Sequence, residues 1–337
     1  MIFRPHNYQS YCIDRLLELP AVGLFLDMGL GKTVTTLTAV KELKYHRFQV
    51  CKVLVIAPKK VAEATWSREA EKWDHLRDMR VSTVLGSRLK REKALARPAD
   101  LYVINRENVE WLVDYYRNDW PFDMVVIDES SSFKDQSTKR WKALKRVRPK
   151  IHRIVLLTGT PAPNTLIDLW AQLYLLDEGA RLGRTIGGFR ERYFQPDKRN
   201  AERVFTYKPK MGTEQAVQDL IGDICISMKA EDYLTLPECV SVDVPVVLDS
   251  KAAKAYTTME REMLLEVAED TITADTAAVL TNKLLQLAGG AVYNAEHEAQ
   301  VIHSCKIEAF LELVESLAGK SALVFYGFQH EKERILA

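Results

Sequence analysis

The sequence has few cysteines and no long apolar run. Five cysteines are scattered through 337 residues, at positions 12, 51, 225, 239 and 305, and no pair has the spacing of a metal or redox site. We therefore expect reduced thiols in a cytosol-like compartment. The opening MIFRPHNYQSYC lacks a basic stretch followed by an apolar one, so we expect no secretory signal. No apolar run reaches the roughly 20 residues that span a bilayer, which argues against a membrane partner.

The chain also has almost no net charge. Its 47 Lys and Arg residues balance 46 Asp and Glu residues, for a formal charge of +1. The field of the whole molecule is therefore weak, and any nucleic acid must be bound by local patches. This argues against a simple basic binding module. The 47% hydrophobic and 28% charged content is ordinary for a soluble globular protein, and the length suggests two domains.

Short apolar runs alternate with longer amphipathic stretches in the first half of the chain. The runs lie at 22–26, 51–58, 101–105, 124–128 and 153–159, and helical patterns include 33–45 and 62–73. Nearly continuous apolar runs are typical of parallel strands buried on both faces. The sequence therefore predicts an α/β doubly wound parallel sheet, in which ligands bind at the carboxyl ends of the strands.

The pattern changes after Pro163. Helical stretches at 166–176 and 213–228 flank a segment rich in Gly and Arg, so we interpret 164–236 as a helical insertion or appendage. Beyond it, 241–249 alternates like a strand. Helices are expected over 250–286 and 304–318, and a buried strand at 321–328.

The segment GLGKT, from Gly29 to Thr33, follows a predicted strand and opens a predicted helix. This is the context that a phosphate-binding loop needs, because glycines let backbone N–H groups approach phosphate oxygens and the helix N-terminus adds positive charge. Gly29 and Gly31 would line the phosphates, Lys32 would pair with the β and γ phosphates, and Thr33 would hold Mg²⁺. The pattern has Leu26 where the usual form has its first glycine. The alternative is a glycine turn with an incidental lysine.

The segment MVVIDES presents Asp128 and Glu129 at the end of another predicted strand. Asp128 would bind Mg²⁺ through water, and Glu129 would orient or deprotonate the attacking water. The alternative is an acidic strand end that caps the next helix.

Two further segments gain meaning only beside these motifs. LLTGTPAPN ends the next strand, and hydroxyls of Thr158 and Thr160 around Gly159 would sense the γ phosphate; alone, the segment reads as a turn. FRPHNYQ precedes the phosphate loop, and Gln9 would hydrogen-bond the edge of adenine with Arg4 or Tyr8 packed nearby. Alone, it is an ordinary N-terminal segment.

Taken in order, these segments resemble the Swi/Snf-type ATPases of helicase superfamily two. RPHNYQ, DMGLGKT, VIAPKKVAEATWSREAEKW, LYVINREN, VVIDESSSFKD and LLTGTPAPN resemble the adenine-reading motif and motifs I, Ia, Ib, II and III. AEDYLTLPECVSVDVPVVLDSKAAKAYTTM resembles the bridge to a second RecA-like lobe, and KIEAFLELVESLAGKSALVFYGF resembles its entry and motif IV. The compact insertions are similar to those of bacterial or phage members.

The resemblance implies a P-loop NTPase of RecA-like fold that binds ATP and Mg²⁺ and tracks along duplex DNA. It implies a first RecA-like ATP-binding lobe over 1–163, the helical insertion over 164–236, and a linker, helices and the start of a second lobe over 237–337. It places DNA phosphates near two pairs of residues: Lys59 and Lys60, Asn105 and Arg106. Replication or repair proteins would be further partners of a monomer in the cytoplasm of a bacterial cell or phage-infected host.

The sequence also departs from the family. Ser130 and Ser131 replace the family's Ala-His or similar pair after Asp-Glu, which bears on how hydrolysis couples to lobe movement, while Lys134 fits the family's lysine. The sequence ends soon after motif IV, so we expect an incomplete second lobe, and no residue is assigned as the arginine finger. Since such a finger contributes roughly 10³–10⁵ in rate, we expect slow hydrolysis unless another group replaces it.

Two other functions stay open. One is an RNA helicase of the same superfamily, and the other is a non-catalytic, ATP-responsive DNA-binding or regulatory protein that lacks the arginine finger. The segment 139–153 has eight Lys or Arg residues and no acid. It is either a DNA-facing stripe or, as we favour, a solvated outer helix with Trp141, Leu144 and Val147 turned inward.

Overall fold

The computed structural model describes the chain except for residues 199–205, 235–239, 270–273, 295 and 318–320. The chain divides into two compact units, Met1–Pro237 and Glu238–Ala337.

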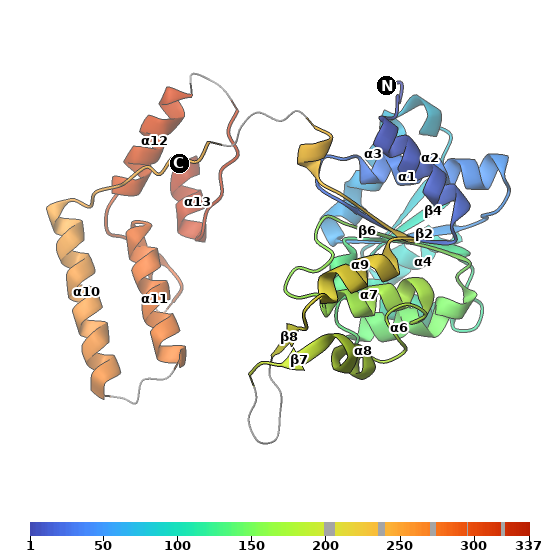
Figure 1. Cartoon of the computed structure of the whole chain (residues 1–337). Coiled ribbons are helices and arrows are strands. Elements are labelled where there is room, and N and C mark those ends of the chain that lie inside the picture. The colour runs from blue at the N-terminus through green and yellow to red at the C-terminus, as the bar shows by residue number, and fades with distance from the viewer. Residues whose placement is uncertain (199–205, 235–239, 270–273, 295, 318–320) are drawn as a thin grey trace. The chain divides into compact units, whose positions relative to one another are not determined.

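The first unit is built on a parallel sheet (Figure 1). Seven strands form it within the described residues, in the order β3-β4-β2-β5-β6-β1-β9, and every pairing is parallel. The strands are β1 (Ala21–Leu26), β2 (Val53–Ala57), β3 (Val81–Val84), β4 (Leu101–Asn105), β5 (Met124–Asp128), β6 (Arg153–Thr158) and β9 (Cys225–Met228). The five expected strands are confirmed, and β3 and β9 are additional.

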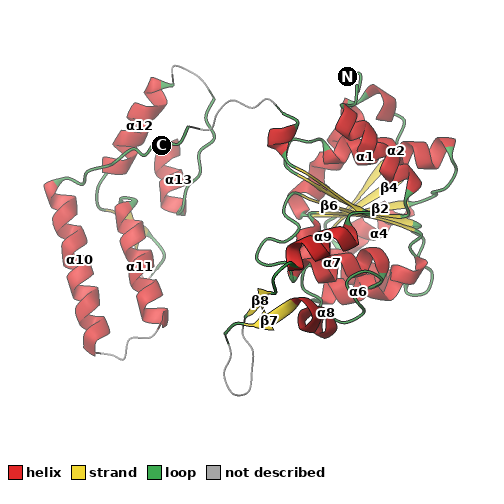
Figure 2. Ribbon diagram, viewed as in Figure 1, coloured by secondary structure: helices red, strands yellow, loops and turns green. Residues whose placement is uncertain are grey.

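Helices cover both faces of this sheet (Figure 2). One face carries α1 (Asn7–Glu18), α2 (Lys32–Lys41) and α3 (Trp66–Lys72). The other carries α4 (Arg88–Ala96), α5 (Val109–Tyr116), α6 (Lys139–Val147), α7 (Asp168–Asp177), α8 (Ile186–Tyr193) and α9 (Thr213–Ile221). The predicted helix over 62–73 begins as a π-helical turn at Val61–Thr65, and α2 continues into another at Glu42–His46.

The core is two apolar layers, one on each face. Along β1, Val22, Leu24 and Leu26 enter the layer under α1 and α2, while Phe25 enters the opposite layer. Successive side chains of a strand point to opposite faces, so a strand covered on both sides must be apolar at almost every position. This explains the continuous apolar runs.

The segment 164–236 belongs partly to the sheet. We expected a helix over 213–228, but α9 ends at Ile221 and residues 225–228 form β9, which pairs with β1. Gly23 faces Cys225 in this pairing, and a Cβ on Gly23 would lie 2.9 Å from the Cys225 sulfur. The missing side chain thus lets β9 approach, and this segment belongs to the same compact unit as the sheet. The strands β7 (Phe194–Pro196) and β8 (Tyr207–Pro209) form an antiparallel pair beside α8.

The second unit is mainly helical in its described residues. It contains α10 (Ser250–Glu269), α11 (Ala274–Ala288), β10 (Ala291–Tyr293), β11 (Ala299–Val301), α12 (Cys305–Ser316) and α13 (Gln329–Leu336). The strand predictions for 241–249 and 321–328 are wrong, because neither segment forms a strand. Val247 and Phe325 are 86% exposed. An apolar strand is stable when neighbours satisfy its backbone and cover its faces, and the described residues supply no such neighbours here.

The expected doubly wound parallel sheet with helices on both faces is confirmed in the first unit, whereas the described residues of the second unit hold no parallel sheet. The carboxyl ends of β1, β2, β4, β5 and β6 lie at one edge of the sheet, where the candidate residues gather.

Candidate active site

The loop between β1 and α2 has the geometry of an anion site. Gly29 (φ 85°) and Gly31 (φ 74°) adopt the left-handed conformation that favours glycine, and Gly31 is the residue before the first turn of α2. Lys32 and Thr33 open the helix, so the unpaired N–H groups of its first turn and its positive dipole end face the loop. Backbone and helix together favour a phosphate at this position.

Lys32 is held by backbone carbonyls in this loop. Its Nζ donates hydrogen bonds to the Leu26 oxygen at 2.6 Å and the Asp27 oxygen at 3.1 Å. Burial lowers the pKa of Lys32, and the nearby charges of Glu129, Asp128 and Asp27 oppose that shift. A partly buried ammonium held by carbonyl oxygens is a ready partner for an anion, because a negative ligand would compensate the cost of burial.

Asp128 ends β5 as a buried carboxylate, 8% exposed. Its Oδ2 accepts a hydrogen bond from the indole Nε1 of Trp66 at 3.0 Å, and its Oδ1 accepts one from the Glu129 amide at 3.1 Å. Burial raises the pKa of Asp128, while the Trp66 hydrogen bond lowers it and the charge of Glu129 raises it further. These contacts fix both carboxylate oxygens in one orientation.

Glu129 has a backbone conformation that side-chain-bearing residues seldom adopt. Its φ of 51° and ψ of 57° lie in the left-handed region. Such strain costs of order 1–3 kcal/mol and persists only where the surrounding structure holds it. The conformation turns the chain sharply between Asp128 and the short helix at Ser130–Phe133.

One cavity of about 700 Å³ brings the predicted nucleotide residues together. Other parts of its wall come from the N-terminus, from Val61 and Thr65, and from Glu69, Lys72 and Trp73. The predicted residues that line it are Arg4, Gln9, Gly29, Gly31, Lys32, Thr33, Asp128 and Glu129. Predicted residues that lie as far apart in the sequence as Arg4 and Glu129 thus line the same cavity, although the role of each stays a prediction.

Gln9 supports the phosphate loop directly. Its Oε1 accepts a hydrogen bond from the His6 amide at 3.0 Å, and its Nε2 donates to the Leu30 oxygen at 3.3 Å. A Cβ on Gly31 would lie 2.5 Å from Nε2, so a larger residue here would have to displace the Gln9 side chain. Gln9 is 6% exposed, and its amide nitrogen carries a second N–H. Its contact with adenine remains a prediction.

The predicted coupling segment lies against the same loop. Thr158 is fully buried at the end of β6, and its hydroxyl accepts a hydrogen bond from the Thr160 amide at 3.1 Å. A Cβ on Gly159 would lie 3.4 Å from the Leu26 oxygen, the carbonyl to which Lys32 donates. The predicted coupling segment therefore passes beside the Lys32 ammonium.

The predicted DNA residues occupy two adjacent loops. β2 and β4 pair with Ala57 opposite Asn105, so the loops that follow them are neighbours. Lys59 and Lys60 are exposed, and Lys59 Nζ lies 3.9 Å from Glu63.

Asn105 and Arg106 are both engaged by Glu107. Asn105 is buried and its Nδ2 donates to Glu107 at 2.8 Å, while Arg106 Nε donates to the same carboxylate at 3.0 Å. DNA contact by these residues stays a prediction.

Sequence reasoning missed three residues of this region. Trp66 is fully buried, and its indole N–H donates a hydrogen bond to Asp128. Gln172 binds Ser130, and Asp27 accepts a hydrogen bond from the Ala230 amide at 3.0 Å. Contacts between residues 42 to 203 positions apart leave no local signal in the sequence. Gln172 alone could have been noticed, because it is a polar residue within the apolar run of α7.

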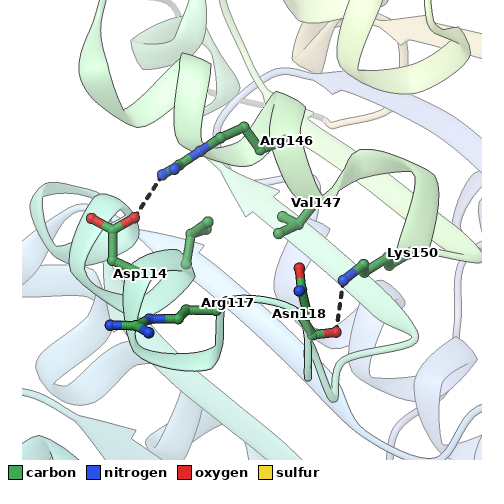
Figure 3. Close-up of a pocket in the computed structure, with 7 residues that line it drawn as sticks. Asp114, Arg117, Asn118, Arg146, Val147 and Lys150 are labelled. Carbon is green, nitrogen blue, oxygen red and sulfur yellow. Dashed lines mark hydrogen bonds and ion pairs between the residues drawn. The ribbon is translucent and has the colours of Figure 1, made fainter.

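A second cavity, of about 600 Å³, lies between the ends of α5 and α6 (Figure 3). Arg146 is 2.8 Å from Asp114, and Lys150 donates to the Asn118 oxygen at 2.7 Å. Helices that follow strands in a doubly wound fold run back, so this cavity lies at the amino edge of the sheet, away from the nucleotide residues.

The basic segment 139–153 contains helix α6, as expected. Trp141, Leu144 and Val147 are buried, with exposures of 3%, 0% and 3%. The prediction of an outer helix with an inward apolar face is confirmed.

Among the described residues, no helix is long and apolar enough to cross a membrane. No group of three or more His, Cys, Asp or Glu side chains in that part of the chain is arranged to hold a metal ion.

Comparison with known proteins supports the motif assignments. A family model described as the SNF2-related domain matches residues 8–290. Protein p41 of Acyrthosiphon pisum secondary endosymbiont phage 1 is 37% identical over 99% of this chain and 74% of its own length. YwqA of Bacillus subtilis, whose name describes an ATP-dependent helicase or translocase, is 25% identical over 94% of this chain and 35% of its own length.

A solved structure has the same fold. The SWI2/SNF2 ATPase core of Sulfolobus solfataricus, in complex with dsDNA, matches with a TM-score of 0.57 and 21% identity, over 99% of this chain and 71% of that one. The family match over most of the chain and the phage relative carry the assignment. This chain belongs to the SNF2-related domain family, the Swi/Snf-type ATPases that its motifs resemble.

Proposed function

We propose that this chain is an ATP-dependent motor that moves on duplex DNA in replication, repair or recombination. The single observation that carries the proposal is the cavity of about 700 Å³ that gathers Lys32, Thr33, Asp128 and Glu129. Family membership and the structural likeness to a core solved with dsDNA support it.

The substrate would be ATP, with its phosphates on the loop before α2. Lys32 would leave the carbonyls of Leu26 and Asp27 and pair with the β and γ phosphates. Gln9 and Arg4 at the cavity wall would receive the adenine end. The loop's N–H groups would orient the phosphate chain toward Glu129.

The residues present fit Mg²⁺. The Thr33 hydroxyl and the Asp128 carboxylate offer oxygen ligands on one cavity wall, and Mg²⁺ in phosphate-transfer sites commonly uses one or two protein ligands besides phosphates and water. When bound, the ion would neutralise phosphate charge that develops during transfer.

Hydrolysis would use Glu129 as the group that orients water. Glu129 would take a proton as the water oxygen attacks the γ phosphorus, and the bond from that phosphorus to the bridging oxygen would break to give ADP and phosphate. Thr158, Gly159 and Thr160, packed beside Leu26, would sense the change. Lys59, Lys60, Asn105 and Arg106 would contact DNA phosphates, and a phage or bacterial cytoplasm suits the relatives.

The experiment measures steady-state ATP hydrolysis by the whole chain with duplex DNA, with RNA and without nucleic acid. We expect duplex DNA to stimulate turnover more than RNA does. Asp114→Asn, at the far edge of the sheet, is the matched control and should behave like the wild type. Stimulation by RNA alone would favour an RNA helicase, and nucleotide binding without turnover would favour an ATP-responsive regulatory protein.

A further inference from the structure

The segment that follows Glu129 is tied to α7 by a buried polar pair. The Ser130 hydroxyl donates a hydrogen bond to Gln172 Oε1 at 2.8 Å. Both residues are fully buried. Buried polar groups without partners are costly, so this contact specifies one arrangement of the two side chains.

The same Gln172 side chain holds the loop after motif III. Its Nε2 donates to the Pro161 oxygen at 2.6 Å and to the Asp168 oxygen at 2.9 Å. One amide therefore links Ser130, which directly follows Glu129, to Pro161, which directly follows Thr160.

A second tie lies one helical turn earlier on α7. Asp168 Oδ2 accepts a hydrogen bond from the Asn164 amide at 3.1 Å and lies 3.6 Å from Lys134 Nζ. Residues four apart share one face of a helix. The first turns of α7 thus bridge the segment after motif II and the loop after motif III at two points.

Gln172 is out of place among its neighbours. In α7, all of whose residues the structure describes, seven are buried and Gln172 is the polar one among them. A leucine would fill such a site by packing alone, whereas an amide is satisfied only when both loops are in position. Directly before Ser130, Glu129 keeps its left-handed backbone, which needs outside support.

We propose that Gln172 and Ser130 are positioning residues that hold Glu129 and the Thr160 loop in register, so that the state of the nucleotide is passed from motif II to motif III. The inference rests on the proposed function. It also accounts for serine in this chain where the family usually has another residue after Asp-Glu. Neither residue lines the nucleotide cavity, so neither would touch the nucleotide.

The experiment compares the whole chain with Ser130→Ala, Gln172→Met and the double variant. Tyr174→Phe is the matched control, because it removes a polar atom from the same helix where the ring packs on Trp141 and Trp170. We expect the affinity for Mg·ATPγS to stay within about threefold of the wild type. DNA-stimulated kcat should fall about tenfold in each single variant, since a small misplacement of reacting groups is costly. The double variant should fall no further, because the two residues act as one unit.

Hydrogen exchange supplies a readout besides turnover. In the wild type, Mg·ATPγS should slow exchange in peptides covering 157–166, and in Gln172→Met that protection should be lost although the nucleotide still binds.

Unchanged kcat and protection, or single effects that multiply in the double variant, would overturn the inference. If Gln172→Met does not fold, Ser130→Ala, which removes only a hydroxyl, tests the inference. A wild-type chain that binds no Mg·ATPγS would contradict the proposed function and the inference together, whereas retained binding with unchanged protection would contradict the inference alone.

Discussion

At the scale of single residues, the nucleotide site depends on a lysine that backbone carbonyls hold in place. Lys32 is partly buried, and Asp27, Asp128 and Glu129 compensate only part of the cost. An anion bound at the loop would supply the remaining compensation. The lysine therefore matters to binding more than to folding.

Lys32→Ala should weaken the affinity for a fluorescent ATP analogue at least 100-fold while the chain stays folded. The removed ammonium is the charge that would face the phosphates, and its present hydrogen-bond partners among the described residues are the backbone oxygens of Leu26 and Asp27 alone. Lys52→Ala, at an exposed lysine, is the control. Equal affinities for the wild type and Lys32→Ala would contradict the assignment of the loop.

Trp66→Phe tests the orientation of Asp128. The change keeps an aromatic ring and removes the N–H that binds Oδ2 at 3.0 Å. A buried acceptor left without its donor costs roughly 1–3 kcal/mol. We expect the affinity for Mg·ADP to fall about tenfold, with the affinity for ADP in EDTA unchanged. A loss of the same size in EDTA would mean that Trp66 supports the cavity rather than the carboxylate.

The sequence could predict the residues of the site that lie at strand ends. Lys32 and Asp128 follow apolar runs, and parallel strands bring their carboxyl ends to one edge, so the shared cavity follows from the pattern. The contacts of Trp66 and Gln172 depend on how α3 and α7 pack on the sheet. That packing joins residues 62 and 42 positions apart and has no local signature.

At the scale of elements, the position of β9 depends on a missing side chain. Gly23→Ala should lower the free energy of unfolding by about 1–3 kcal/mol, because the new methyl group would meet the Cys225 sulfur at 2.9 Å and the Phe25 ring at 3.0 Å. Adding Cys225→Ala should recover part of the loss, as measured by urea unfolding. Additive losses in the double variant would mean that the sulfur is not the obstacle.

The buried carboxylate of Asp100 joins the π-helical turn after α2 to the starts of β3 and β4. Asp100 lies 3.4 Å from Lys44 Nζ, and it accepts hydrogen bonds from the Arg80 amide at 2.9 Å and from Arg80 Nη2 at 3.3 Å. Burial raises the pKa of Asp100, but the Arg80 hydrogen bonds, a hydrogen bond from Tyr45 and the Lys44 charge outweigh it, so the pKa lies below its ordinary value.

Asp100→Asn should therefore destabilise the chain by about 2–4 kcal/mol at pH 7. A carboxylate with a lowered pKa contributes stability above its unfolded pKa of about 3.9, and the contribution is lost as the pH falls through the folded pKa. Urea unfolding from pH 7 to pH 3 should show that the difference in unfolding free energy between wild type and variant shrinks below about pH 4. If the difference in unfolding free energy stays constant over this range, the charge of Asp100 is not its cause.

The elements that sequence reasoning missed or misplaced are short or lack partners. β3 and β9 have four residues each, and β9 directly follows a helical pattern that conceals it. The segments 241–249 and 321–328 have strand-like patterns, yet pairing requires a neighbour as well as a pattern. Apolar alternation reports a preference for burial, and tertiary packing decides whether it is met.

At the scale of the whole molecule, every residue that lines the nucleotide cavity lies in the first compact unit. A chain of residues 1–237 should therefore bind the fluorescent ATP analogue within about threefold of the full chain. Circular dichroism would establish that the shorter chain is folded. A folded shorter chain without nucleotide binding would mean that the second unit completes the site.

The most direct test of the motor assignment is ATP hydrolysis with saturating duplex DNA by the wild type and Glu129→Gln, with nucleotide affinity measured on the same samples. The variant keeps the size of the side chain and removes the carboxylate that would accept the proton from water. We expect DNA-stimulated turnover by the wild type, and a variant that binds ATP with near-normal affinity but loses turnover by at least 100-fold. Equal turnover by both proteins would contradict the role of Glu129 and, with it, the assignment of the cavity as a hydrolytic site.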